Sequence, residues 1–102
     1  MILGRRFAAV IDSQLALFER EHAGLIRDCD RAEAAYDDAP RDEAEERYGD
    51  YMDLVADGAE LLADLRDNYA ATLDERTGER YAAAFDRAVR RRLPRFSLDL
   101  DQ

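Results

Sequence analysis

Residues that are mostly apolar recur at intervals of three and four along the first part of the chain, and this spacing leaves few folds open. The positions are Ala8, Ile11, Leu15, Phe18, His22, Leu25, Cys29, Ala32 and Tyr36. Such a pattern, kept for about four heptads, predicts a helix that packs along a second helix. We expect the first helix to cover residues 5–37, because Pro40 disfavours helical geometry in the residue before it.

The same spacing returns after this proline and predicts a second long helix over residues 42–75. Its positions are Ala44, Tyr48, Tyr51, Val55, Gly58, Leu62, Leu65, Tyr69 and Thr72. The short connection makes the two helices antiparallel neighbours. Folding the chain at the connection places His22 opposite Gly58, and large residues repeatedly oppose small ones, as interdigitated packing requires.

A third, shorter helix is predicted over residues 78–93, between Thr77–Gly78 and Pro94. Its apolar face consists of Tyr81, Phe85, Ala88 and Val89. At about 1.5 Å per residue it spans roughly 22 Å and covers only one end of a hairpin about twice as long. We place it at the open end of the hairpin, beside Phe7, Val10, Leu17, Leu61 and Leu73. The predicted fold is therefore all-α: a long antiparallel helical hairpin plus a short third helix in one domain over 1–93, followed by an extended tail at 94–102.

Near the turn of the hairpin, apolar residues lie beside the packing face where the third helix does not reach them. Ile26, Met52 and Leu54 are the clearest cases. Because an exposed apolar patch usually marks an association surface, we predict a homodimer in which two hairpins form a helical bundle. Its interface is predicted to include Leu25, Ile26, Cys29, Tyr48, Tyr51, Met52, Leu54 and Val55.

Charge is high and unevenly distributed: 24 acidic residues stand against 15 basic ones, all of them Arg, for a net charge of −9. The second helix carries acids opposite its apolar face, at Glu43, Glu46, Asp50, Asp53, Asp57, Glu60, Asp64 and Asp67. This is where an amphipathic helix keeps its solvated side, although the same side is suited to a basic partner.

The end of the third helix is basic instead, with a patch made of Arg87, Arg90, Arg91, Arg92 and Arg95. We expect these side chains to complement the helix dipole and to bridge to the acidic helices. Phosphate contacts with a nucleic acid are a less favoured interpretation, because the rest of the chain is acidic.

One pair of residues suggests metal chemistry. Glu19 and His22 form Glu-x-x-His on the first helix. These four residues resemble the element of ferritin-like proteins in which a Glu and a His one turn apart bind iron or another divalent metal. The positions expected opposite them supply no carboxylate, so only a dimer that brings two copies together completes a site. The alternative is that His22 is a polar residue at a core position, which sets the register of the helices.

Catalytic patterns are scarce. The chain has one His, one Cys and two Ser, and it lacks a glycine-rich phosphate loop and paired cysteines. No apolar run approaches the roughly 20 residues that span a bilayer, and Asp12 and Gln14 interrupt the apolar N-terminal segment, which argues against an export signal. We therefore expect a cytoplasmic, non-catalytic interaction or scaffold module without a cofactor, with metal binding and nucleic-acid association as the alternatives.

Overall fold

The computed structural model describes residues 2–97, with side chains from position 7 onward. Within this range the chain contains helices and no strand, which confirms the predicted all-helical class. The elements are α1 (Ile2–Glu21), α2 (Ala23–Asp37), the 3-10 helix η1 (Arg41–Glu43), α3 (Ala44–Ala70), α4 (Glu75–Arg92) and the 3-10 helix η2 (Pro94–Phe96).

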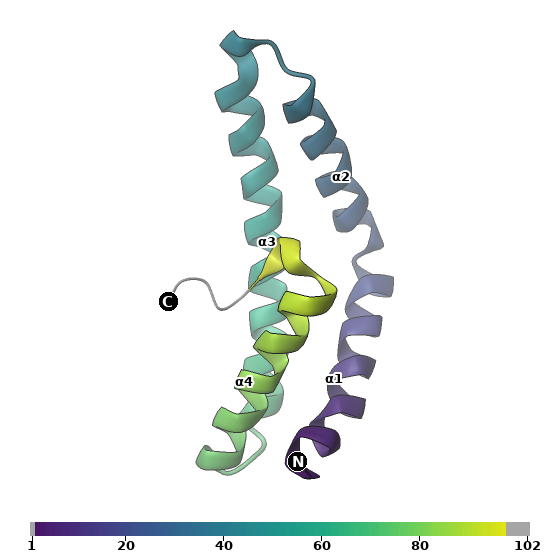
Figure 1. Ribbon diagram of the computed structural model, residues 1–102, viewed down its shortest axis with the longest axis vertical. Coiled ribbons are helices and arrows are strands. Elements are labelled where there is room, and N and C mark those ends of the chain that lie inside the picture. The colour runs from purple at the N-terminus through teal and green to yellow at the C-terminus, as the bar shows by residue number, and fades with distance from the viewer. Residues whose placement is uncertain (1, 98–102) are drawn as a thin grey trace.

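α2 and α3 run antiparallel and meet at a turn that we call the distal end of the molecule (Figure 1). The turn is short: Asp38 N donates to Ala34 O, and the extended backbone of Pro40 leads directly into η1. η2 contacts α3 near its middle, and beyond that point α2 and α3 continue towards the turn by themselves (Figure 1). The distal part of a molecule that measures 51 × 28 × 21 Å is therefore only two helices thick.

The helix predicted over 5–37 is bent at His22, where the structure divides it into α1 and α2. Backbone hydrogen bonds continue across the bend, from His22 N to Phe18 O (2.8 Å) and from Ile26 N to His22 O (3.1 Å). Gly24 follows closely, and glycine weakens a helix interior. The bend directs α1 away from α3, and α4 packs against both of them (Figure 1).

α4 begins earlier than residue 78, because Asp74 caps its first turn. The Asp74 carboxylate accepts hydrogen bonds from Thr77 N and Thr77 Oγ1, each at 2.9 Å. These bonds, led by the one from the Thr77 amide, hold the pKa of Asp74 below its ordinary value. Gly78 lies inside α4 and does not end α3; a Cβ there would stand 2.8 Å from Ala70 O, so its absence permits the close approach of the two helices.

The apolar face predicted for this helix is confirmed and forms the centre of the core. Tyr81, Phe85 and Val89 are fully buried. The Tyr81 ring packs edge-on against Phe7, with centroids 5.4 Å apart, and against Tyr69 at 4.7 Å. The predicted neighbour Leu17 is the exception: it stays exposed, because α1 presents a different face to α4.

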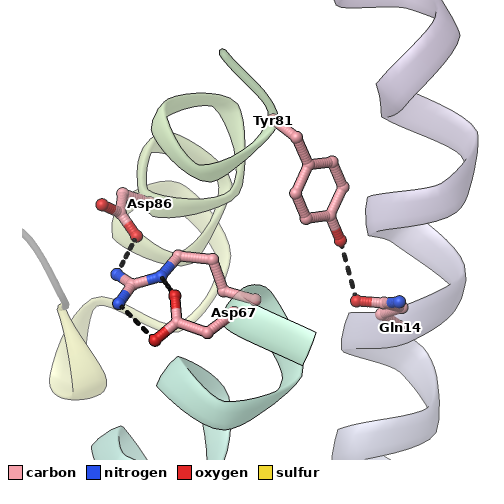
Figure 2. Close-up of polar contacts among 5 residues, drawn as sticks. Gln14, Asp67, Tyr81 and Asp86 are labelled. Atoms are coloured by element: carbon pink, nitrogen blue, oxygen red, sulfur yellow. Dashed lines mark hydrogen bonds and ion pairs between the residues drawn. The ribbon is translucent and has the colours of Figure 1, made fainter. Parts of the chain in front are cut away.

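Two polar contacts fasten α4 to its neighbours (Figure 2). On the α1 side, the Tyr81 hydroxyl donates to Gln14 Oε1 at 2.9 Å, and burial raises the pKa of Tyr81 to about 12. On the α3 side, Arg66 donates to Asp86 of α4 at 2.9 Å and to its chain neighbour Asp67 at 2.8 Å. The hydrogen bond to Asp67, followed by that to Asp86, raises the pKa of Arg66 despite partial burial.

Candidate functional site

The segment after α4 folds back onto the middle of the hairpin. Pro94 begins η2, which places the Phe96 side chain against α3 with only 2% of its surface exposed. A Cβ at Gly58 would overlap the Phe96 ring, and the ring also packs edge-on against Phe18 at a centroid distance of 5.9 Å. Phe96 therefore occupies the space beside Gly58 in which the sequence pattern predicts His22.

This segment differs from the predicted tail. An extended chain was expected over 94–102, whereas residues 94–96 form η2 and residues 98–102 lie outside the described range. The physical reason is the notch at Gly58, which offers an aromatic ring more burial than an extended arm receives.

Arg95 fixes the same segment through charge. Its guanidinium donates to Tyr51 Oη at 3.1 Å, to Asp30 at 3.0 Å and to Glu33 at 2.8 Å, and it lies 5.6 Å from the centroid of the Tyr51 ring. Burial by itself would lower the pKa of Arg95, but the hydrogen bonds to Tyr51, Asp30 and Glu33 outweigh it and raise the pKa. A basic segment is thus held by a tyrosine and two carboxylates of the hairpin.

The segment around η2 reaches apolar residues of the hairpin that were predicted to be covered by a second copy of the chain. Ile26 lines a cleft of about 530 Å³ together with Leu93 and Pro94, and both Ile26 and Leu54 pack partly buried against the core. The premise that the hairpin's own chain leaves Ile26 uncovered is therefore wrong. The chain after α4 turns back and reaches it.

The predicted interface residues divide into three groups. Cys29 and Val55 are buried in the chain's own core, and burial raises the pKa of the Cys29 thiol. A second group is half-buried, namely Leu25, Ile26, Tyr51 and Leu54. Tyr48 and Met52 remain exposed, at 47% and 39%. This last pair is the part of the predicted interface most accessible to a partner.

Tyr36 lies beside this pair. The sequence pattern did not predict it as an interface residue, because its place on the apolar spacing predicted burial. It is 37% exposed, and its ring lies 5.2 Å from that of Tyr48. We call Tyr36, Tyr48 and Met52 the distal surface. Position was the available signal: Tyr36 is the second-last residue of α2, where a two-helix layer encloses side chains incompletely.

Glu19 and His22 do not gather further ligands. Both Glu19 oxygens accept hydrogen bonds from Arg92, at 2.9 and 3.3 Å, and the His22 ring packs against Phe18 with centroids 5.1 Å apart. Among the described residues, no three His, Cys, Asp or Glu side chains come together as metal ligands.

The basic patch is divided between two faces. Arg92 pairs with Glu19 of α1, and Arg95 is held by the acids of α2. Arg87 and Arg91 line a shallow cleft of about 140 Å³ between α1 and α4, together with Asp12. The expected bridging to acidic helices thus exists for Arg92 and Arg95.

The acidic stripe predicted for the second helix faces solvent along η1 and α3. The exposed residues of this stripe are Glu43, Glu46, Asp50, Asp53, Asp57, Glu60, Asp64 and Asp67. Arg47 and Arg66 are the basic residues that α3 places beside them. Over residues 2–97, none of the helices has the length and apolar character needed to cross a membrane.

Comparison with protein-family models, with curated proteins and with solved structures found no match to this chain.

Proposed function

We propose that the chain is a non-catalytic protein-interaction module whose contact surface is the distal surface. The observation that carries this proposal is the clustering of exposed apolar side chains. Among the described residues, four large hydrophobic side chains are exposed, and three of them are Tyr36, Tyr48 and Met52. They lie on the two-helix part of the fold, which no other segment of the described chain covers (Figure 1). Tyrosine and methionine are enriched at protein interfaces because they give large, adaptable contact areas.

A second copy of the chain is the partner that the sequence predicts. Two distal ends packed face to face would convert two-helix layers into a four-helix bundle. The accessible part of the predicted interface, Tyr48 and Met52, supports this dimer. The charge opposes it, because residues 28–57 contain twelve acids and three Arg in each copy.

The proposal is tested with the double variant Tyr48→Ser/Met52→Ser and the control Leu17→Ser. Leu17 is the fourth exposed hydrophobic residue and lies on α1, away from the distal end. Sedimentation velocity measures self-association, and cross-linking in a cell extract followed by mass spectrometry measures association with other proteins. We expect the double variant to lose the association and the control to keep it. If wild type and double variant associate equally, or if neither associates with anything, the proposal is wrong.

A further inference from the structure

The distal surface continues along α3 as an apolar stripe with acidic edges. Tyr48, Met52 and Ala56 follow one another at intervals of four, so they lie on one side of the helix, and all three are exposed. Glu45 precedes this stripe and Asp53 lies beside it. Both are exposed, and neither forms an ion pair among the described residues.

The stripe also leaves room for a partner's backbone. Gly49 lies between Tyr48 and Met52 in sequence, is exposed, and a Cβ there would find nothing within 4 Å. Ala56 adds a second small side chain about two turns further on. Small residues beside a large anchor allow a helix to approach closely.

The chain's own C-terminal segment shows which chemistry the hairpin accepts. Arg95 stacks on Tyr51 and reaches Asp30 and Glu33, all on α2 and α3. Tyr48 lies one turn before Tyr51 on α3, so the distal surface offers the next tyrosine in the same acidic setting, without an occupant from the described chain. The hairpin thus already binds one basic segment through a tyrosine of α3 and two carboxylates of α2.

Charge favours a different protein over a second copy of the chain as the partner of the distal surface. Residues 28–57 hold twelve acids and three Arg, and two of these Arg are engaged within the chain: Arg31 with Asp28, and Arg47 with Glu43 and Asp50. A second copy would place this excess against itself, whereas a cationic segment would neutralise it. Resting on the proposed function, we infer that the distal surface binds a basic amphipathic helix from another protein.

The bound helix presents its apolar residues to Tyr48 and Met52 at i, i+3 and i+4 spacing. Its Lys and Arg side chains meet Glu45 at the N-terminal end of the stripe and Asp53 beside it, and they stack on the tyrosine rings. The stripe from Glu45 to Ala56 is about 17 Å long, which matches a partner helix of roughly three turns.

The test uses two synthetic helical peptides of about four turns with leucine at the same i, i+3 and i+4 positions. Lysine and arginine fill the remaining positions of the cationic peptide, and glutamate fills those of its acidic counterpart. Fluorescence anisotropy measures the binding of each labelled peptide to the full chain at several salt concentrations. We expect the cationic peptide to bind, with an affinity that falls as salt rises, and the acidic peptide not to bind.

Apolar contact is tested with Tyr48→Ser/Met52→Ser, which should weaken binding of the cationic peptide by about tenfold or more, as loss of interface anchors does. Leu17→Ser should leave it within about twofold of wild type. Far-UV circular dichroism checks that each variant keeps its helix content. Equal affinity of wild type and double variant would overturn the inference, because the peptide would then be binding elsewhere on the acidic surface.

Charge is tested with a matched pair of variants that each remove two carboxylates. Glu45→Gln/Asp53→Asn should weaken the cationic peptide about threefold to tenfold, whereas Glu75→Gln/Glu79→Gln, on exposed positions of α4, should have a smaller effect. Equal weakening by both pairs would mean non-specific attraction and would overturn the inference. If the cationic peptide fails to bind while the association measured for the proposed function still depends on Tyr48 and Met52, the basic partner is wrong and the interaction surface stands. If both measurements fail, both proposals fall.

Discussion

Replacing Gly58 by alanine should destabilise this protein, whereas the same replacement at Gly49 should stabilise it. Both glycines lie inside α3, where exchange of glycine for alanine normally contributes about 0.5–1 kcal/mol of stability. At Gly49 the new methyl group meets nothing within 4 Å, so the full gain is expected. At Gly58 it overlaps the ring of Phe96, which is only 2% exposed and must shift to admit it.

The loss of stability in Gly58→Ala depends on how far the new methyl group displaces the buried Phe96 ring. Overpacking costs about 1–3 kcal/mol, so after the helical gain of about 0.5–1 kcal/mol we expect a net loss of up to about 2.5 kcal/mol. Phe96→Ala by itself creates a cavity beside Phe18 and should cost about 3–5 kcal/mol. In the Phe96→Ala background the obstacle is gone, and Gly58→Ala should then stabilise as Gly49→Ala does.

Equilibrium urea unfolding followed by far-UV circular dichroism measures the four corners of this double-mutant cycle, with Gly49→Ala as the control. The predicted coupling free energy between Gly58 and Phe96 equals the overpacking cost, about 1–3 kcal/mol. A stabilising Gly58→Ala in the wild-type background would refute the reasoning, because it would mean that Phe96 does not lie on α3. A coupling energy near zero would have the same meaning.

Three further predictions concern single side chains. Tyr81→Phe removes the hydrogen bond to Gln14 and should cost about 0.5–1.5 kcal/mol at neutral pH. Because the pKa of Tyr81 is raised, its neutral phenol contributes stability that is complete below pH 10.0, the ordinary pKa, and is lost as the pH rises through about 12. The difference in unfolding free energy between wild type and Tyr81→Phe should therefore shrink across that pH interval. At any pH above the ordinary aspartate pKa of 3.8, Asp74→Ala should lower the melting temperature, because it removes the cap on Thr77. The native pKa of Asp74 is lower still, so the difference in melting temperature should disappear only as the pH falls through that native pKa. A difference that persists in stronger acid would contradict the cap. Cys29 is fully buried with a raised thiol pKa, so a thiol reagent at neutral pH should react with it only after unfolding; rapid labelling of the native protein would contradict this.

Burial by the chain itself also explains why part of the predicted interface is not accessible to a partner. Leu25 and Cys29 belong to the same apolar spacing as Phe18, and that spacing identifies residues that pack without identifying what covers them. The distal surface is smaller because η2 covers part of the hairpin. The exposed members of the predicted interface, Tyr48 and Met52, lie on the part of the hairpin that η2 does not cover.

The sequence by itself determined the helical class, the antiparallel pairing of the hairpin and the buried face of α4. These features depend on interactions between residues close in sequence: the spacing of three and four, the proline at the turn, and an apolar face such as Tyr81, Phe85 and Val89. Each produces a sequence pattern within one or two helical turns, so it can be predicted without knowing the rest of the fold.

Tertiary structure decided the bend at His22, the position of α4 against both α1 and α3, and the docking of Phe96 at Gly58. Each of these depends on how well side chains distant in sequence fill the same space, and the helical spacing carries no record of that fit. A glycine on the packing face of a helix looks the same in the sequence whether another helix or a returning aromatic ring fills the space beside it. Only the path of the chain after α4 distinguishes the two, and that path also determines which part of the hairpin remains open to a partner.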